Sequence, residues 1–165
     1  NQISTAFISE EFHTIAIGVD EGKTIFVHSL EHKLPVFLIK LDENNKADLI
    51  AISQSWGFIV VISSKSDTQN FVTLYNINGL FIKQVKIKSI INQIVCWTNR
   101  DGFDFMCFSD VNGNIYVTEI YEISEELFDN PFYSCNCEVD KLMFDKSNET
   151  IIIQTVNRKE IIKSV

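Results

Sequence analysis

Residues 102–121, GFDFMCFSDVNGNIYVTEIY, contain two runs of alternating apolar side chains on either side of a polar turn. Successive side chains of a β-strand point to opposite faces of a sheet, so Phe103 and Phe105 are expected on one face of the first run. The turn contains the pair Asn112–Gly113, and both residue types tolerate the positive φ angles of a tight strand reversal. The stretch therefore predicts a β-hairpin with positive φ at this pair.

The composition of the whole chain favours strands over helices. Its 165 residues are 45% hydrophobic and 22% charged, which is ordinary for a globular domain. Ile, Val and Phe are frequent, and Asn, Ser and Asp interrupt them at short intervals. Because β-branched and aromatic side chains fit the pleated surface of a sheet, we expect an all-β protein.

The layout of short strands recurs along the chain with a period of roughly 45 residues. Residues 8–17, ISEEFHTIAI, align with residues 52–61, ISQSWGFIVV. The repeats divide the chain into four approximate segments: 1–43, 44–88, 89–137 and 138–165. A period of this length, made of up to four short strands, indicates four-stranded antiparallel β-propeller blades, which stack on one another to bury both faces of each sheet.

The segments resemble degenerate WD repeats. In the first three segments the Trp-Asp pair of such repeats is replaced by His28–Ser29, Tyr75–Asn76 and Thr118–Glu119. The Trp-Asp pair stands at the end of the third strand of such a repeat. The polar turn before this strand is better kept, as in Asp110–Gly113, and it fixes the strand reversal. The last segment, 138–165, ends after its third predicted strand, so we expect the last four blades of a larger β-propeller. A self-contained β-sandwich or barrel is the alternative.

Part of the chain, residues 45–123, is similar to the C-terminal WD-repeat propeller of the BEACH-domain proteins (beige/neurobeachin-like). The matching positions are Trp56–Gly57–Phe58, Asn78–Gly79, Cys96–Trp97, Gly102–Phe105 and Glu119. These proteins are large cytosolic scaffolds of vesicle and lysosome traffic. The resemblance implies a non-catalytic protein–protein interaction platform that binds other proteins through its propeller rims. It also implies upstream blades and a BEACH domain in the same polypeptide.

Two other classes of function stay open at this point. A WD-repeat subunit of another intracellular assembly, such as a coat, ribosome-biogenesis or cytoskeletal complex, would have the same repeat. A propeller-hosted hydrolase would need converging carboxylates or a metal. An activity that is lost when Asp20 or Asp110 is neutralised, with folding unchanged, would support this class.

Charge and hydropathy exclude further classes. The formal net charge is −8 and Lys and Arg are not clustered, which argues against binding to a nucleic acid backbone. No apolar run approaches the ~20 residues of a membrane-spanning helix. We therefore expect no direct membrane insertion. The resemblance to BEACH-domain proteins implies a cytoplasmic protein that is peripheral to vesicle or endolysosomal membranes through its partners.

Catalytic and metal-binding motifs are weak. The histidines His13, His28 and His32 do not accompany a nucleophile motif, so we expect no enzyme and no cofactor. Cys135 and Cys137 form a C-x-C pair without the spacing of a zinc site, and we interpret them as two buried, reduced thiols.

One candidate partner-binding motif is Asn130–Pro131–Phe132, which follows the acidic segment 122–129. An exposed Asn-Pro-Phe tripeptide resembles the ligand of endocytic EH domains. The alternative is a proline-terminated loop with Phe132 packed under the adjoining blade.

Large apolar side chains beside turns are expected to fill the wedges between blades. The residues concerned are Phe12, Trp56 and Trp97. We interpret them as core residues, with a partner-binding hot spot as the alternative.

Overall fold

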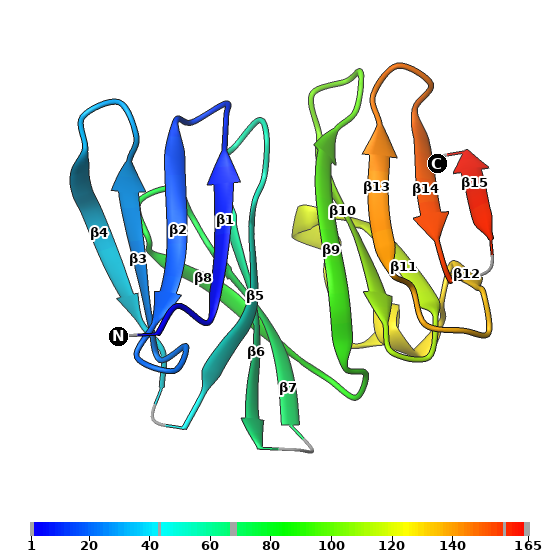
Figure 1. The fold of residues 1–165 in the computed structure, drawn as a ribbon, viewed down its shortest axis with the longest axis horizontal. Coiled ribbons are helices and arrows are strands. Elements are labelled where there is room, and N and C mark those ends of the chain that lie inside the picture. The colour runs from blue at the N-terminus through cyan, green and yellow to red at the C-terminus, as the bar shows by residue number, and fades with distance from the viewer. Residues whose placement is uncertain (1, 43, 67–68, 157, 164–165) are drawn as a thin grey trace. The chain divides into compact units, whose positions relative to one another are not determined.

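The computed structural model describes residues 2–42, 44–66, 69–156 and 158–163 (Figure 1). Within these residues the chain forms four antiparallel sheets and two short 3-10 helices. The all-β class predicted from the composition is confirmed. The chain divides into two compact units, residues 1–88 and 89–165.

The first unit contains two four-stranded sheets in which the strands follow one another in sequence order (Figure 1). Sheet 1 consists of β1 (Thr5–Ser9), β2 (Thr14–Val19), β3 (Thr24–Ser29) and β4 (Leu34–Lys40). Sheet 2 consists of β5 (Lys46–Ile52), β6 (Ile59–Ser66), β7 (Gln69–Tyr75) and β8 (Phe81–Ile87). Each is an up-and-down meander, the architecture of a propeller blade.

The second unit contains one four-stranded and one three-stranded sheet. Sheet 3 consists of β9 (Ile91–Thr98), β10 (Asp104–Asp110), β11 (Asn114–Glu119) and the short β12 (Tyr133–Ser134). Sheet 4 consists of β13 (Lys141–Asp145), β14 (Thr150–Gln154) and β15 (Lys159–Lys163). The 3-10 helices η1 (Ile120–Glu122) and η2 (Glu126–Asp129) lie between β11 and β12.

The hairpin predicted from residues 102–121 is formed by β10 and β11, with Cys107 opposite Val117. Its turn differs from the expectation at one residue. Gly113 has a φ of 82°, whereas Asn112 is not among the residues with positive φ, so the prediction for Asn112 is wrong. The reason is the Asp110 carboxylate, whose Oδ1 accepts hydrogen bonds from the N–H groups of Asn112 and Asn114, each at 2.9 Å. This side chain holds the turn with a single left-handed residue.

Two further turns repeat this geometry. In each, an Asn Oδ1 accepts hydrogen bonds from the N–H groups two and four residues later: Asn76 from Asn78 and Leu80, and Asn99 from Asp101 and Phe103. The fourth residue of each turn is a glycine with positive φ, Gly79 or Gly102. The three turns join different strand pairs, β7–β8, β9–β10 and β10–β11, so this turn chemistry is local to each hairpin and does not mark one position of the repeat.

Sheets 1 and 2 share one apolar core, and β1 lies against β5. Its fully or almost fully buried members are Ala16, Ile25, Val27, Ile39, Ala47, Ile50, Ile52, Ile59, Val61 and Tyr75. Phe12 packs partly buried against this core, in agreement with its prediction. Residues at alternate positions of each strand supply these side chains, as the pleat requires.

Sheets 3 and 4 share a second core around Trp97. The Trp97 ring stacks between Phe105, at 5.7 Å between ring centroids, and Phe144, at 4.5 Å. Trp97 is 1% exposed, and its predicted place in the core is confirmed.

The prediction for Trp56 is wrong, because its side chain is 59% exposed. A Cβ atom at the neighbouring Gly57 would lie 2.5 Å from Ile77 Cδ1 and 3.0 Å from Phe12 Cζ. These two side chains fill the space beneath the turn, and Trp56 remains at the surface. In the described part of the chain, no helix has the length and apolar character needed to cross a membrane.

Candidate interaction site

The segment between sheets 3 and 4, residues 120–139, carries the candidate motif, and we call it the connector. The buried apolar side chains of the connector include Ile120, Ile123 and Phe128. The Phe128 ring lies 5.6 Å from that of Phe108 and 5.1 Å from that of Tyr116, measured between centroids. The connector is therefore fixed on sheet 3 by apolar packing.

The outer side of the connector is acidic. Glu122, Glu125, Glu126 and Asp129 are exposed, and the sequence from 119 to 132 contains no Lys or Arg. Clustered carboxylates without nearby cations create a negative potential that attracts positively charged partners.

The tripeptide Asn130–Pro131–Phe132 is exposed at the end of this acidic run. The Phe132 side chain is 43% exposed, in contrast with the alternative in which it is packed under the adjoining blade. Phe128, four residues earlier, takes the buried aromatic position instead. The backbone N–H of Phe132 donates to the carbonyl oxygen of Ile115 at 2.8 Å, so the end of the motif is aligned along β11.

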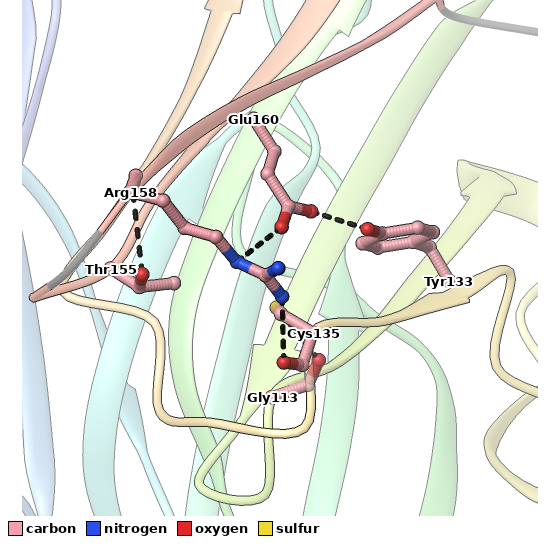
Figure 2. Close-up of polar contacts among 6 residues, drawn as sticks. All are labelled: Gly113, Tyr133, Cys135, Thr155, Arg158 and Glu160. Carbon is pink, nitrogen blue, oxygen red and sulfur yellow. Dashed lines mark hydrogen bonds and ion pairs between the residues drawn. The ribbon is translucent and has the colours of Figure 1, made fainter.

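A group of polar contacts, which we call the latch, ties the connector to β15 (Figure 2). The Tyr133 hydroxyl donates to Glu160 Oε2, and Arg158 Nε lies 2.5 Å from Glu160 Oε1. Arg158 Nη2 donates to the carbonyl oxygen of Cys135 at 3.1 Å. The Thr155 N–H donates to the Arg158 carbonyl oxygen at 2.9 Å, which holds the backbone of Arg158. The latch therefore fixes the connector at its C-terminal side.

The electrostatics of the latch favour neutral forms of two groups. The hydrogen bond to Glu160 raises the pKa of Tyr133, because the carboxylate prefers the protonated phenol. Desolvation raises the pKa of Cys135, whose Sγ donates to the carbonyl oxygen of Gly113 at 3.1 Å. A protonated thiol is a poor nucleophile, so this cysteine packs and donates a hydrogen bond.

The interpretation of the C-x-C pair as two buried thiols holds for Cys135 and is wrong for Cys137, which is exposed. The pair follows β12 instead of continuing it, so the two side chains do not share one face of a strand. Among the residues that the structure describes, no group of three or more His, Cys, Asp and Glu side chains could hold a metal ion.

The other residues considered for catalysis, three histidines and two aspartates, lie in different turns and strands. His13 and His32 are in turns and His28 is in β3. Asp20 lies in the exposed turn between β2 and β3, with a φ of 53°. Asp110 is 1% exposed, and its Oδ2 accepts hydrogen bonds from the Tyr116 hydroxyl and Asn114 Nδ2, each at 3.0 Å. Its carboxylate is thus occupied in holding the hairpin.

Sequence reasoning missed the latch. Arg158 and Glu160 are separated along the sequence from Tyr133 and Cys135, and only the packing of sheet 4 beside the connector brings them together. The one local signal is the Arg-x-Glu spacing, which places both side chains on the same side of an extended chain.

Comparisons with known proteins identify a fold and no family. No family model matches the sequence, and no curated protein matches it. Many solved structures are similar in fold, among them hydrazine synthase from Kuenenia stuttgartiensis, with a TM-score of 0.72 and 14% sequence identity. The match covers 98% of this chain and 46% of that one, so the chain spans less than half the length of this neighbour. At this identity the similarity shows only that the chain has an all-β, propeller-like arrangement of sheets.

Proposed function

We propose that the chain is a non-catalytic protein–protein interaction platform built from WD-repeat-like propeller blades. The observation that carries the proposal is an exposed Asn-Pro-Phe tripeptide, Asn130–Phe132, on an acidic connector that is anchored at both ends. The blade interpretation is supported by the four meander sheets. The propeller would be larger than these four sheets.

The cellular role follows from the similarity of residues 45–123 to the propeller of BEACH-domain proteins. We propose a cytoplasmic scaffold of vesicle and lysosome traffic, peripheral to membranes through its partners. Upstream blades and a BEACH domain of the same polypeptide belong to this proposal.

The proposed partner is an endocytic EH domain that takes the tripeptide into an apolar pocket. Phe132 would supply the apolar anchor, because a partly exposed aromatic ring buries a large area on binding. The hydrogen bond from the Phe132 N–H to Ile115 and the latch at Tyr133 hold the backbone in place, which lowers the entropy cost of association. The exposed carboxylates of residues 122–129 would accelerate the encounter with a basic rim.

Titration calorimetry of the chain with a purified EH domain tests this proposal. We expect saturable binding that Phe132→Ala weakens by at least about ten-fold, because truncating a central apolar anchor removes a hot spot. Phe103→Ala is the matched control, since Phe103 is a 51% exposed aromatic residue outside the connector, and it should leave the affinity unchanged. Equal affinities of wild type and Phe132→Ala, or no binding by either, would reject the tripeptide as the binding determinant.

A further inference from the structure

Two cysteines near the end of the connector, Cys135 and Cys137, contact the same glycine of the β10–β11 hairpin. The carbonyl oxygen of Gly113 accepts hydrogen bonds from the Cys135 backbone N–H at 3.0 Å and from the Cys135 Sγ at 3.1 Å. The backbone of Cys137 reaches this glycine as well, because a Cβ atom on Gly113 would lie 2.0 Å from the Cys137 carbonyl oxygen. Gly113 therefore holds the two cysteines close to each other.

The backbone between the two cysteines turns at Asn136, which has a φ of 54° in the left-handed region. An extended chain would separate Cα atoms two residues apart by about 6.6 Å, close to the upper limit of about 6.8 Å for a disulfide. A left-handed residue between them shortens this separation. Desolvation raises the pKa of Cys135, and the charge of a thiolate at Cys137 raises it further, as expected for neighbouring sulfur atoms.

The two thiols differ in their access to reagents. Cys137 is exposed, whereas Cys135 is 3% exposed. Thiol–disulfide exchange begins with the attack of an accessible thiolate on a disulfide sulfur. Cys137 can therefore make the first attack, and Cys135 lies two residues away from the sulfur that results.

We propose that Cys135 and Cys137 form an oxidisable dithiol that reacts with a low-molecular-weight disulfide such as oxidised glutathione. The Cys137 thiolate attacks one sulfur of the reagent, the reagent's S–S bond breaks, and one glutathione leaves as a thiolate. Cys135 then loses its proton to solvent and attacks the Cys137 sulfur, which releases the second glutathione. The chain loses two electrons and two protons in all, and the oxidised glutathione takes them up to give two reduced molecules.

The second step is the slower one, because the Cys135 thiol is buried and has to leave its hydrogen bond to Gly113. Its position offsets the small thiolate fraction, since an intramolecular attack has a high effective concentration. The new bond would close a small loop in the connector beside the latch, where Arg158 Nη2 binds the Cys135 carbonyl oxygen. The inference goes beyond the proposed function and does not depend on binding by the tripeptide.

Intact-mass measurement of the folded 165-residue chain, after incubation with oxidised glutathione at neutral pH, tests the inference. The wild-type chain should lose the mass of two hydrogen atoms and retain no glutathione, and peptide mapping should place the disulfide between Cys135 and Cys137. Cys135→Ser removes only the second step, so this variant should retain one glutathione on Cys137. Cys137→Ser removes the first step and should stay unmodified. Excess reduced glutathione should restore all four thiols of the wild-type chain.

Cys96→Ser is the matched control, since Cys96 is a buried thiol outside the connector, and it should react like wild type. A wild-type chain that stays unmodified, or that retains glutathione on Cys137, overturns the inference. A disulfide between two copies of the chain also overturns it, because Cys135 would then not be the second thiol. If Cys135→Ser fails to fold, as judged by circular dichroism, the product of the wild-type chain decides.

Discussion

Cys135 and Cys137 are two residues apart in sequence but differ in their access to solvent. Desolvation raises the pKa of Cys135, and burial raises the pKa of Cys96 to about 12. Cys107 is also buried, and desolvation raises the pKa of its thiol as well. At the scale of single residues, the environment of each thiol therefore decides its reactivity.

We expect one of the four thiols to react rapidly with Ellman's reagent in the folded chain at neutral pH, and all four to react after denaturation. The rapid thiol is Cys137, because attack requires an accessible sulfur and a thiolate fraction that the buried cysteines lack. Cys137→Ser should remove the rapid phase, and Cys135→Ser should retain it. Two or more rapid thiols in the wild-type chain would contradict the burial of Cys135.

At the scale of elements, the latch links the short β12 to β15 beside the core around Trp97, against which Tyr133 packs. Tyr133 and Arg158 share the Glu160 carboxylate, one through a hydrogen bond and the other through an ion pair. Because β12 is only two residues long, it adds few backbone hydrogen bonds to the sheet. The side-chain contacts of the latch compensate for these missing bonds and hold the connector.

The raised pKa of Tyr133 predicts how the latch responds to pH. A group whose pKa is higher in the folded state contributes stability that is complete below its unfolded value, about 10 for tyrosine, and that is lost as the pH rises through the folded value. The difference in urea midpoint between wild type and Tyr133→Phe should thus be positive at pH 7 and shrink above about pH 10.

A Tyr133→Phe difference that grows at alkaline pH would have the wrong sign and would refute the hydrogen bond to Glu160.

At the scale of the whole molecule, stability comes from cores between pairs of sheets. Each strand supplies apolar residues to both sides, so no sheet buries its surface alone.

The two tryptophans provide a test of these cores. Trp97→Ala removes a ring stacked between Phe105 and Phe144 and should lower the free energy of unfolding by about 3–5 kcal/mol. Trp56→Ala, at a 59% exposed ring, should change it by less than about 1 kcal/mol. Urea denaturation followed by circular dichroism measures both. Similar losses for the two variants would show that the Trp97 stack is not a main support of its core.

Strands can be predicted from the sequence, because the alternation of apolar side chains depends on neighbouring residues. Turns are local as well, since an Asn or Asp three residues before a glycine accepts the hydrogen bonds of the turns at Asn76, Asn99 and Asp110. Which of two similar residues is buried depends instead on the packing of distant strands. Trp97 is buried and Trp56 is not, and Cys135 is buried and Cys137 is not. The latch joins Tyr133 to Glu160, which lies far away in the sequence. These outcomes depend on which side chains from distant strands fill the same space, and a period-two pattern carries no information about those partners.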